Sequence, residues 1–362
     1  MKVRLPVRKA ILDRKTYEAP AERRWGKVRL DFNENTSGCS KAALAALRQL
    51  SGKELAMYPE YQAPTKILAK YFGVKAEELL LTNGGDDALR VFFDTFVEPR
   101  SHILICEPTF PMYRFYAEIA GARVEALQYS REMEFPLAAV LKAVRKRPRV
   151  FFLANPNNPT GTLVDKGAIA AILRAAPRTA VVLDEAYADF SGVTGVPWIR
   201  RYPNLFIAKT FSKAAGLAGL RLGAVIAQRE SLAMVKRALP PFPVNAAALA
   251  AGVAAVGEQR TIERYIRETK RLREWFAAEL KQRGVRVFPS KGNFLLADFG
   301  SAGPTLFRRL TRNGILIRER SKDLGPGFAR ITIGTNRELQ AFLRILDRGD
   351  ILWRAEGGPF SG

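Results

Sequence analysis

Short apolar runs alternate with segments of helical periodicity through the middle of the chain. Each run is bounded by turn-forming residues, and the runs occupy residues 102–106, 149–154, 179–184, 204–209 and 221–227. Between them, segments such as 136–147 and 166–176 carry apolar residues at helical spacing. This alternation is typical of a parallel sheet that is covered by helices. We therefore predict an α/β fold with a mostly parallel central sheet and helices on both faces.

The pattern changes after Pro243. A long helical region extends over about residues 246–283, and a last helix is predicted at 336–347. Between these helices lie apolar runs that one further helix separates into pairs, at 285–288, 293–299, 315–318 and 329–333. Strands grouped in this way predict a smaller α+β domain. We place the larger domain at residues 40–245 and the smaller one at 1–39 together with 246–355.

Composition narrows the class of protein. The chain has 362 residues, 48% of them apolar, and no run of 18 apolar residues, so we expect no membrane span. The basic N-terminus has no apolar core or small-residue cleavage site, which argues against a secretory signal. Cys39 and Cys106 provide no disulfide framework and no metal-ligand spacing, and we expect a cytoplasmic protein without a metal. The single histidine, His102, opens a predicted strand, so a structural role is expected for it.

The formal net charge is +23. Such a charge suits a nucleic-acid partner, but it also suits a basic surface without a specific partner. The basic residues are dispersed along the chain, and in the stretch 260–286 glutamates interleave with them, as on a solvated helix face. We therefore expect no nucleic-acid partner, and a basic active site would suit small anionic substrates.

The most informative stretch is AKTFSKAAGLAGLRLG (208–223), which begins at the end of a predicted strand. Its small residues let the backbone approach a ligand closely. Thr210, Ser212 and Arg221 offer two hydroxyls and a guanidinium, which suit a phosphate monoester. Lys213 stands among them and could serve as a Schiff-base nucleophile. Alone this is a weak indication, because most lysines near serine and threonine lie on the surface.

A carboxylate ends another predicted strand, in VVLDEAY (181–187). Asp184 is placed to point into the ligand crevice of an α/β sheet. Pyridoxal phosphate needs such a carboxylate, because it keeps the pyridine nitrogen protonated and lets the ring accept electrons. A helix cap or a metal ligand is the alternative, although no clustered partner supports a metal.

Three further motifs follow predicted strands. NPNNPTG (155–161) is a tight turn whose asparagine amide can donate to a phenolate oxygen. LLLTNGGDDAL (79–89) leads a glycine-rich turn into a helix start, which can face a phosphate. EPTFPMY (107–113) offers Phe110 for stacking on a flat ring. Separately they could be a plain turn, a glycine turn and a core aromatic, but five motifs after parallel strands would converge on one crevice.

With these motifs in this order, the sequence resembles the fold-type-I pyridoxal-phosphate enzymes, and among them the histidinol-phosphate aminotransferases. The resemblance extends from DFNENTSG (31–38) to RITIGT (330–335). Two motifs depart from the usual pattern: Thr36 replaces a proline, and NGGDD has Gly85 and Asp87 where serine and glutamate are usual. Backbone N–H groups can still bind the phosphate, so the chemistry is not affected.

The resemblance implies a role for each matching residue. Lys213 carries the cofactor and moves the proton, Asp184 pairs with the pyridinium, and Tyr187 with Asn158 holds the ring oxygen. Phe110 stacks on the ring, and the cofactor phosphate is bound by Gly85, Asp86, Ser212 and Arg221, with Thr210 close by. Tyr58 reaches the cofactor phosphate of the neighbouring subunit, which implies a homodimer with shared active sites. Arg330 takes the substrate carboxylate, and Arg318 and Tyr17 lie near the substrate phosphate, with Asn158 also facing the substrate.

The implied reaction is a ping-pong transamination in histidine biosynthesis. Glutamate converts the cofactor to pyridoxamine phosphate, and imidazole acetol phosphate then receives the amino group to give histidinol phosphate; the reverse direction uses 2-oxoglutarate. The same scaffold serves aromatic aminotransferases and threonine-phosphate decarboxylase, which stay open as alternatives. A cofactor-domain DNA-binding regulator is suggested only by the charge. Only about thirty residues precede DFNEN, too few for a helix-turn-helix module with its linker.

Overall fold

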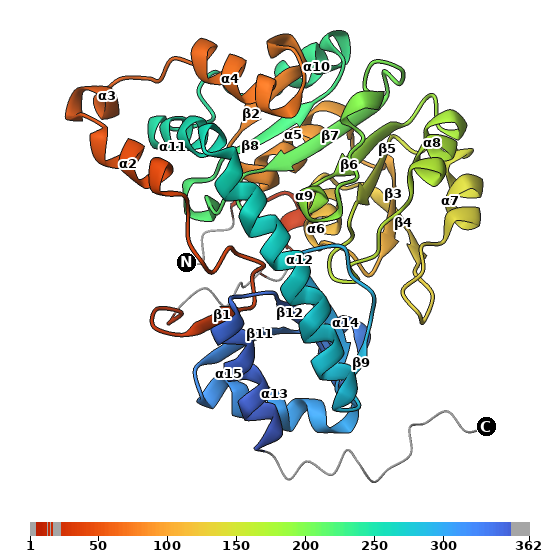
Figure 1. Ribbon diagram of the computed structural model, residues 1–362. Helices are drawn as coiled ribbons and strands as arrows, with labels where there is room; N and C mark the ends of the chain where they lie inside the picture. Colours follow the sequence, from red (N-terminus) through yellow and green to blue (C-terminus); the bar gives the residue numbers. More distant parts are fainter. Residues whose placement is uncertain (1–4, 13, 15, 17–22, 349–362) are drawn as a thin grey trace.

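The computed structural model describes residues 5–12, 14, 16 and 23–348, which form a large and a small sheet domain joined by the long helix α12 (Gln259–Gln282). Figure 1 shows α12 running from the helices of the large domain, at the top, down to the small domain. No helix within the described residues has the length and apolar character that crossing a bilayer requires.

The large sheet has seven strands. In spatial order they are β2 (Leu79–Thr82), β8 (Gly223–Ile226), β7 (Leu205–Thr210), β6 (Ala180–Asp184), β5 (Val150–Ala154), β3 (His102–Glu107) and β4 (Arg123–Gln128). All neighbours from β7 to β4 pair in parallel, while β8 is antiparallel to both β7 and β2. The prediction of a mostly parallel sheet is therefore confirmed.

One strand of the predicted parallel set runs in the opposite direction. The apolar run 221–227 contains β8, which residues 211–222 connect to β7. That connection holds a single 3₁₀ turn, η3 (Ala218–Leu220), and no α-helix of the kind that usually forms a parallel crossover, so an antiparallel return fits it. The edge strand β4 was not predicted, because charged residues at 123 and 125 interrupt its apolar character.

Helices cover both faces of this sheet, as the alternation predicted. Successive residues of a strand point to opposite faces, so Phe151 packs in one core and Phe152 in the other. The first core includes α4 (Gln62–Phe72), α7 (Leu137–Val144), α8 (Lys166–Ala175) and α11 (Ala246–Gly257). The second includes α5 (Gly84–Phe96), α6 (Met112–Ile119) and α10 (Arg229–Lys236).

The small sheet has five strands. Their order is β1 (Val28–Leu30), β11 (Ile315–Glu319), β12 (Phe328–Thr332), β10 (Phe294–Asp298) and β9 (Arg286–Val287). β1 pairs with β11 in parallel, and the other pairs are antiparallel. The sheet packs against α12, α13 (Gly303–Arg312) and α15 (Asn336–Asp347), which gives the α+β arrangement predicted.

The helical region predicted over 246–283 is divided at Glu258 into α11 and α12. α11 packs on α2 (Lys41–Gln49) and α4, and its buried residues belong to the core of the large sheet. This packing favours a domain boundary inside α12 over one at 245/246. The predicted division into residues 40–245 and residues 1–39 with 246–355 remains a proposal. We propose to move its boundary at 245/246 into α12.

The remaining short elements connect these layers. They are α1 (Lys9–Leu12), α3 (Gly52–Ala56), η1 (Ala76–Glu78), α9 (Ala188–Ser191), η2 (Val196–Trp198), η4 (Gly300–Ala302) and α14 (Ser321–Leu324).

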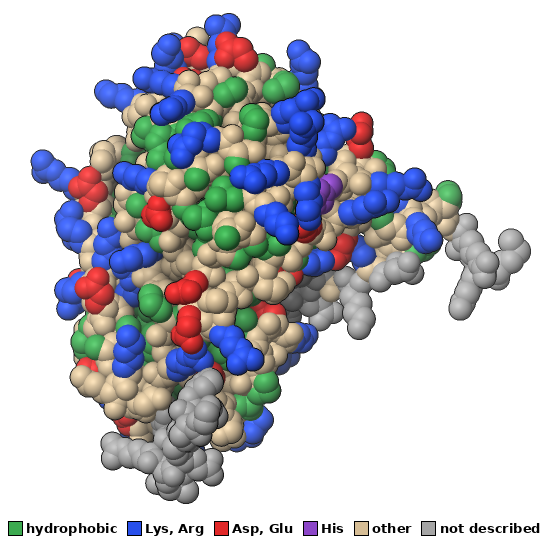
Figure 2. Space-filling model, turned by 90° about the vertical axis from the view of Figure 1, so that its right-hand side faces the viewer, with side chains coloured by type: hydrophobic (Ala, Val, Ile, Leu, Met, Phe, Trp, Pro, Cys, Tyr) green, Lys and Arg blue, Asp and Glu red, His purple; other side chains and the backbone are tan. Residues whose placement is uncertain are grey.

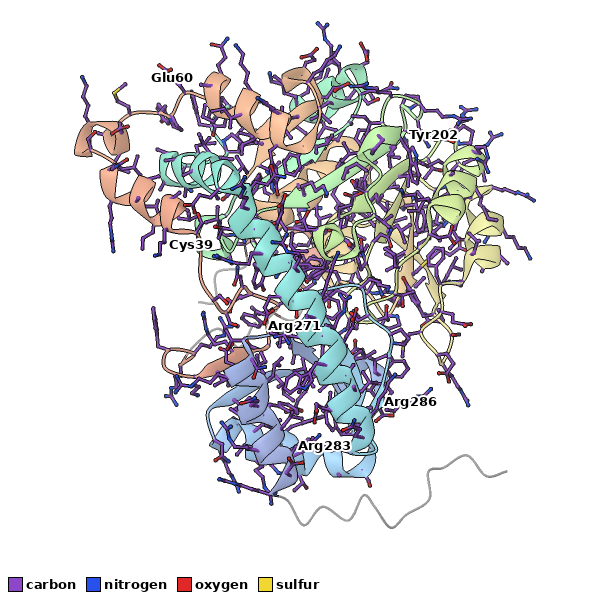
Figure 3. The ribbon with its side chains drawn as sticks, in the orientation of Figure 1. Cys39, Glu60, Tyr202, Arg271, Arg283 and Arg286 are labelled. Atoms are coloured by element: carbon purple, nitrogen blue, oxygen red, sulfur yellow. The ribbon has the colours of Figure 1, made fainter. Side chains whose placement is uncertain are left out.

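The basic surface is dispersed. Figure 2 shows Lys and Arg side chains spread over the visible face without forming one block. Figure 3 labels Arg271, which lies on α12, and Arg283, which lies at the C-terminal end of that helix. Arg271 pairs with Glu268 at 2.6 Å, and Arg283 pairs with Glu279 at 2.7 Å. These pairs agree with the solvated helix face expected for residues 260–286.

Candidate active site

The carboxyl ends of β2, β3, β5, β6 and β7 meet at one cavity of about 460 Å³. The small domain closes it with side chains of β11 and β12 and with the segment that follows β1. The predicted site residues that line the cavity are Gly85, Asp86, Phe110, Asn158, Asp184, Tyr187, Thr210, Ser212, Lys213, Arg221, Arg318 and Arg330. Five motifs far apart in the sequence therefore do converge in space.

A polar cup forms where α5 begins. The first N–H groups of a helix lack intrahelical partners, and Gly85 and Asp86 bring this end of α5 to the cavity wall. The hydroxyls of Thr210 and Ser212 stand 2.9 Å apart beside it. Arg221 pairs with Asp86 at 2.8 Å, so a guanidinium, two hydroxyls and free N–H groups surround one point.

The cup exists because glycines let two backbone segments meet. A Cβ at Gly223 would lie 2.5 Å from the carbonyl carbon of Gly84, and a Cβ at Gly84 would lie 2.7 Å from an Arg221 nitrogen. Gly84 also has a φ of +80°, which favours glycine. A larger residue at Gly223 would push β8 away from the start of α5, and one at Gly84 would displace the Arg221 guanidinium.

Lys213 lies in the turn after β7. Its Nζ donates to the backbone oxygen of Phe32 at 2.9 Å and stands 5.7 Å from the centre of the Tyr187 ring. Phe32 also lines the cavity, although the sequence analysis gave it no role. The amine is thus held over the floor of the cavity by a segment that precedes the large domain.

Asp184, the last residue of β6, is held on both carboxylate oxygens. Oδ1 accepts the Ala186 N–H at 3.0 Å, and Oδ2 accepts the Tyr113 hydroxyl at 2.7 Å. Burial raises the pKa of Asp184 above its ordinary value, and the two hydrogen bonds oppose that shift only in part. A buried carboxylate of this kind is stabilised by a cationic partner, such as a pyridinium.

Tyr113 was missed in the sequence analysis. It is fully buried, and its only signal was its place three residues after Phe110 in EPTFPMY, one helical turn away. Tyr113 is the second residue of α6 and packs in the second core against the sheet, from where its hydroxyl reaches Asp184.

Arg330 links the two domains at the cavity wall. It donates to Asn158 Oδ1 at 2.6 Å and also to the backbone oxygen of Asp31. Burial lowers its pKa to about 10, with the positive charges of Arg320 and Arg318 adding to the effect. Such a desolvated guanidinium is a strong partner for a carboxylate.

Arg318 lies directly opposite Arg330, because the two are register partners in β11 and β12. Arg320, which the sequence analysis missed, also lines the cavity. Arg320 could have been predicted from its position two residues after Arg318 in ILIRER, since positions i and i+2 of a strand share a face. Arg320 pairs with Asp323 of α14.

One predicted residue, Tyr58, does not line this cavity. Tyr58 is 77% exposed and stacks on Phe242 with ring centres 4.5 Å apart. Tyr17 lies outside the described residues. His102 is at the opposite end of β3, where its Nε2 stands 2.8 Å from Glu125.

A second lysine of the cavity lining, Lys209 of β7, forms a buried ion pair. Lys209 Nζ stands 2.5 Å from Glu185, which also accepts hydrogen bonds from Thr194 and the Gly195 N–H. Burial lowers the pKa of Lys209, but the carboxylates of Glu185 and Asp189 outweigh burial and raise it overall. The charged state of Lys209 is therefore favoured.

These residues fit a flat, phosphorylated pyridine ring that carries a carbonyl. The glycine-built cup suits a phosphate, the buried Asp184 suits a ring nitrogen that carries a proton, and the Lys213 amine lines the same cavity. Phe110 forms one side of the cavity. The donor set therefore matches pyridoxal phosphate, as the motifs predicted.

The chain belongs to the class I and II aminotransferases, whose family model matches residues 26–346. It is a pyridoxal-phosphate-dependent enzyme of that class. Within it the chain belongs to the histidinol-phosphate aminotransferase family. A histidinol-phosphate aminotransferase of Geobacillus sp. (strain WCH70) is 35% identical to it over 88% of this chain and 89% of the relative.

Solved structures agree with this placement. The histidinol-phosphate aminotransferase of Sinorhizobium meliloti, solved in complex with pyridoxal-5'-phosphate, superposes with a TM-score of 0.81 at 25% identity, covering 88% of this chain and 89% of that one. The L-threonine-O-3-phosphate decarboxylase of Porphyromonas gingivalis gives 0.78 at 26% identity, covering 88% and 98%. Both of these enzymes therefore share the fold of this chain.

Proposed function

We propose that this enzyme transfers an amino group between histidinol phosphate and 2-oxoglutarate, as a step of histidine biosynthesis. The observation that carries the proposal is the group of three arginines, Arg318, Arg320 and Arg330, on one wall of the cavity. Glutamate and histidinol phosphate both end in an anion, and arginine binds carboxylates and phosphates in a bidentate manner. The 35% identity to a histidinol-phosphate aminotransferase supports the same substrate.

Pyridoxal phosphate supplies the electron sink for the reaction when it is bound. The chain holds its phosphate with Gly85, Asp86, Thr210, Ser212 and Arg221. Arg221 and the helix start supply positive charge there, and the hydroxyls supply donors.

The remaining side chains orient the ring and move the proton. Asp184 holds a proton on the ring nitrogen, Phe110 stacks on the ring, and Tyr187 and Asn158 bind its oxygen. Lys213 Nζ carries the cofactor and shuttles the proton at the reacting carbon, for which an amine beside the cavity floor is suited.

Substrate binding falls to the small domain in this proposal. Arg330 takes the carboxylate of the amino donor, with Asn158 beside it. Arg318 binds the substrate phosphate, together with Tyr17.

We also propose a homodimer in the cytoplasm. Tyr58 is exposed and lies away from the cavity of its own chain, which supports its reaching the cofactor phosphate of a partner subunit. Both cysteines are free thiols, which suits a reducing compartment. Small anionic molecules, and no nucleic acid or membrane, are the proposed partners.

The test is the absorbance of the cofactor-loaded protein after mixing with L-histidinol phosphate or L-histidinol. We expect the visible band to disappear with both compounds, at a kcat/KM about 100-fold higher for L-histidinol phosphate. L-histidinol lacks the phosphate and would lose its two charge-assisted hydrogen bonds to the protein. Equal reactivity of the two compounds would contradict the substrate assignment, and so would reaction with aromatic amino acids alone.

A second candidate is decarboxylation of threonine phosphate, which the likeness to the P. gingivalis enzyme supports. Release of carbon dioxide from L-threonine phosphate, with no amino transfer to 2-oxoglutarate, would favour it over the aminotransferase.

A further inference from the structure

Asn33 lies in the segment between β1 and the large domain, and it touches the hydroxyl of Tyr187. Its Nδ2 donates to Tyr187 Oη at 3.0 Å. Asn33 is completely buried. No role was assigned to it from the sequence, although it stands in the DFNEN motif.

The asparagine is locked in place by the small domain. Its backbone N–H donates to Thr332 Oγ1 at 2.9 Å, and its backbone oxygen accepts from Asn293 Nδ2 at 3.0 Å. Its φ of +55° is in the left-handed region, which asparagine tolerates better than most residues.

The hydrogen bonds also fix which end of the amide faces Tyr187. The Thr332 hydroxyl donates to Asn33 Oδ1 at 3.2 Å, and among the described residues it has no other acceptor. A flipped amide would leave the hydrogen of this buried hydroxyl without a partner, which is costly. The Nδ2 group is therefore the one that faces Tyr187.

This arrangement determines what Tyr187 can do. Its oxygen accepts the Asn33 bond, so its own hydrogen is directed elsewhere, and Tyr187 lines the cavity. We propose that Asn33 is a positioning residue, which makes Tyr187 a donor toward the ring oxygen of the cofactor. The inference rests on the proposed role of Tyr187.

The proposal predicts a spectroscopic effect. A donor on the ring oxygen draws negative charge from it and weakens its hold on the proton that it shares with the Lys213 nitrogen. Loss of that donor should therefore raise the pH at which the visible absorbance of the bound cofactor titrates. One hydrogen bond corresponds to a shift of about half to one pH unit.

The experiment compares Asn33→Gly and Asn33→Asp with the wild-type protein, all loaded with cofactor. Glycine accepts the positive φ and removes the amide. Aspartate keeps the shape but accepts the Tyr187 hydrogen instead of donating to the oxygen. We expect an upward shift of the titration in both variants, larger for aspartate. Thr332→Ser, which keeps the hydroxyl, is the matched control and should titrate like the wild-type protein.

Tyr187→Phe separates the possible outcomes. It should shift the titration upward by itself, and adding Asn33→Gly to it should cause no further shift, because the two residues act as a unit. The inference is overturned if Asn33→Gly and Asn33→Asp titrate like the wild-type protein while Tyr187→Phe is shifted. It is also overturned if Asn33→Gly shifts the titration equally with and without Tyr187. If Tyr187→Phe itself causes no shift, the proposed role of Tyr187 fails as well.

Discussion

At the scale of single residues, Asp184 links the stability of the protein to its cofactor. It is buried at the floor of the cavity, and its pKa is raised by that burial despite hydrogen bonds from Tyr113 and Ala186. In the protein without cofactor, ionisation of this carboxylate therefore costs stability. The bound ring nitrogen offsets that cost, which ties the stability of the protein to its cofactor.

A pH series of Asp184→Asn tests this point. An aspartate whose pKa is raised on folding stabilises the folded state only while it is protonated. That contribution is lost as the pH rises from the ordinary value of 3.8 through the raised one. Without cofactor, we expect the Tm of the wild-type protein to fall relative to Asp184→Asn as the pH rises. Loaded with cofactor, the variant should lose activity by about 100-fold or more.

Glu60→Gln is the control for this series. Glu60 lies on the surface, as Figure 3 shows, and its replacement changes the net charge by the same amount. A Tm difference for Asp184→Asn that is independent of pH would contradict the electrostatic explanation.

At the scale of elements, the parallel strands and their order along the chain could be predicted because they are continuous apolar runs that end in polar motifs. The antiparallel direction of β8 could not be predicted, since an apolar run such as 221–227 carries no information about strand direction. The site residues that lie in motifs at the strand ends could be predicted because each motif directly follows a recognisable apolar run. Asn33 and Tyr113 were missed because their roles arise from contacts across 154 and 71 residues of sequence.

The start of α5 gives an element-scale prediction. Gly223→Ala would place a Cβ 2.5 Å from the Gly84 carbonyl carbon, so β8 and the start of α5 must separate. We expect the dissociation constant of pyridoxal phosphate, measured by titration of the cofactor-free protein, to rise by roughly 5- to 150-fold, because overpacking of this kind costs about 1–3 kcal/mol.

Gly257→Ala is the matched control for that change. Gly257 ends α11, and a Cβ there would meet nothing within 4 Å. If Gly223→Ala binds the cofactor as tightly as the control does, the cup is not built by close approach of these two segments.

The whole molecule raises the question of whether one chain is a complete enzyme. Tyr58 belongs to the exposed apolar surface near α3 and α4, with Met57, Leu55 and Phe242 also exposed. In the proposed homodimer this surface faces the partner, and Tyr58 contributes to the partner's cofactor phosphate. The basic side chains, which Figure 2 shows dispersed over the visible face, need no role in the reaction.

Mixing Lys213→Ala with Tyr58→Ala subunits tests the shared site. In a hybrid dimer, the chain that keeps Lys213 would receive Tyr58 from its partner, so one site is intact. Random exchange should then give about a quarter of the wild-type activity, because half of the dimers are hybrids with one of two sites restored. Activity no higher than the mean of the two parent variants would contradict a Tyr58 that serves the partner's site.

The most direct measurement is to reduce the cofactor-loaded protein with borohydride and map the labelled peptide by mass spectrometry. The account predicts that the cofactor is fixed on Lys213, and that Lys213→Ala folds but takes no label. A label on Lys209, which is held in its ion pair with Glu185 four residues earlier, or on any other lysine, would contradict the assignment of the active site.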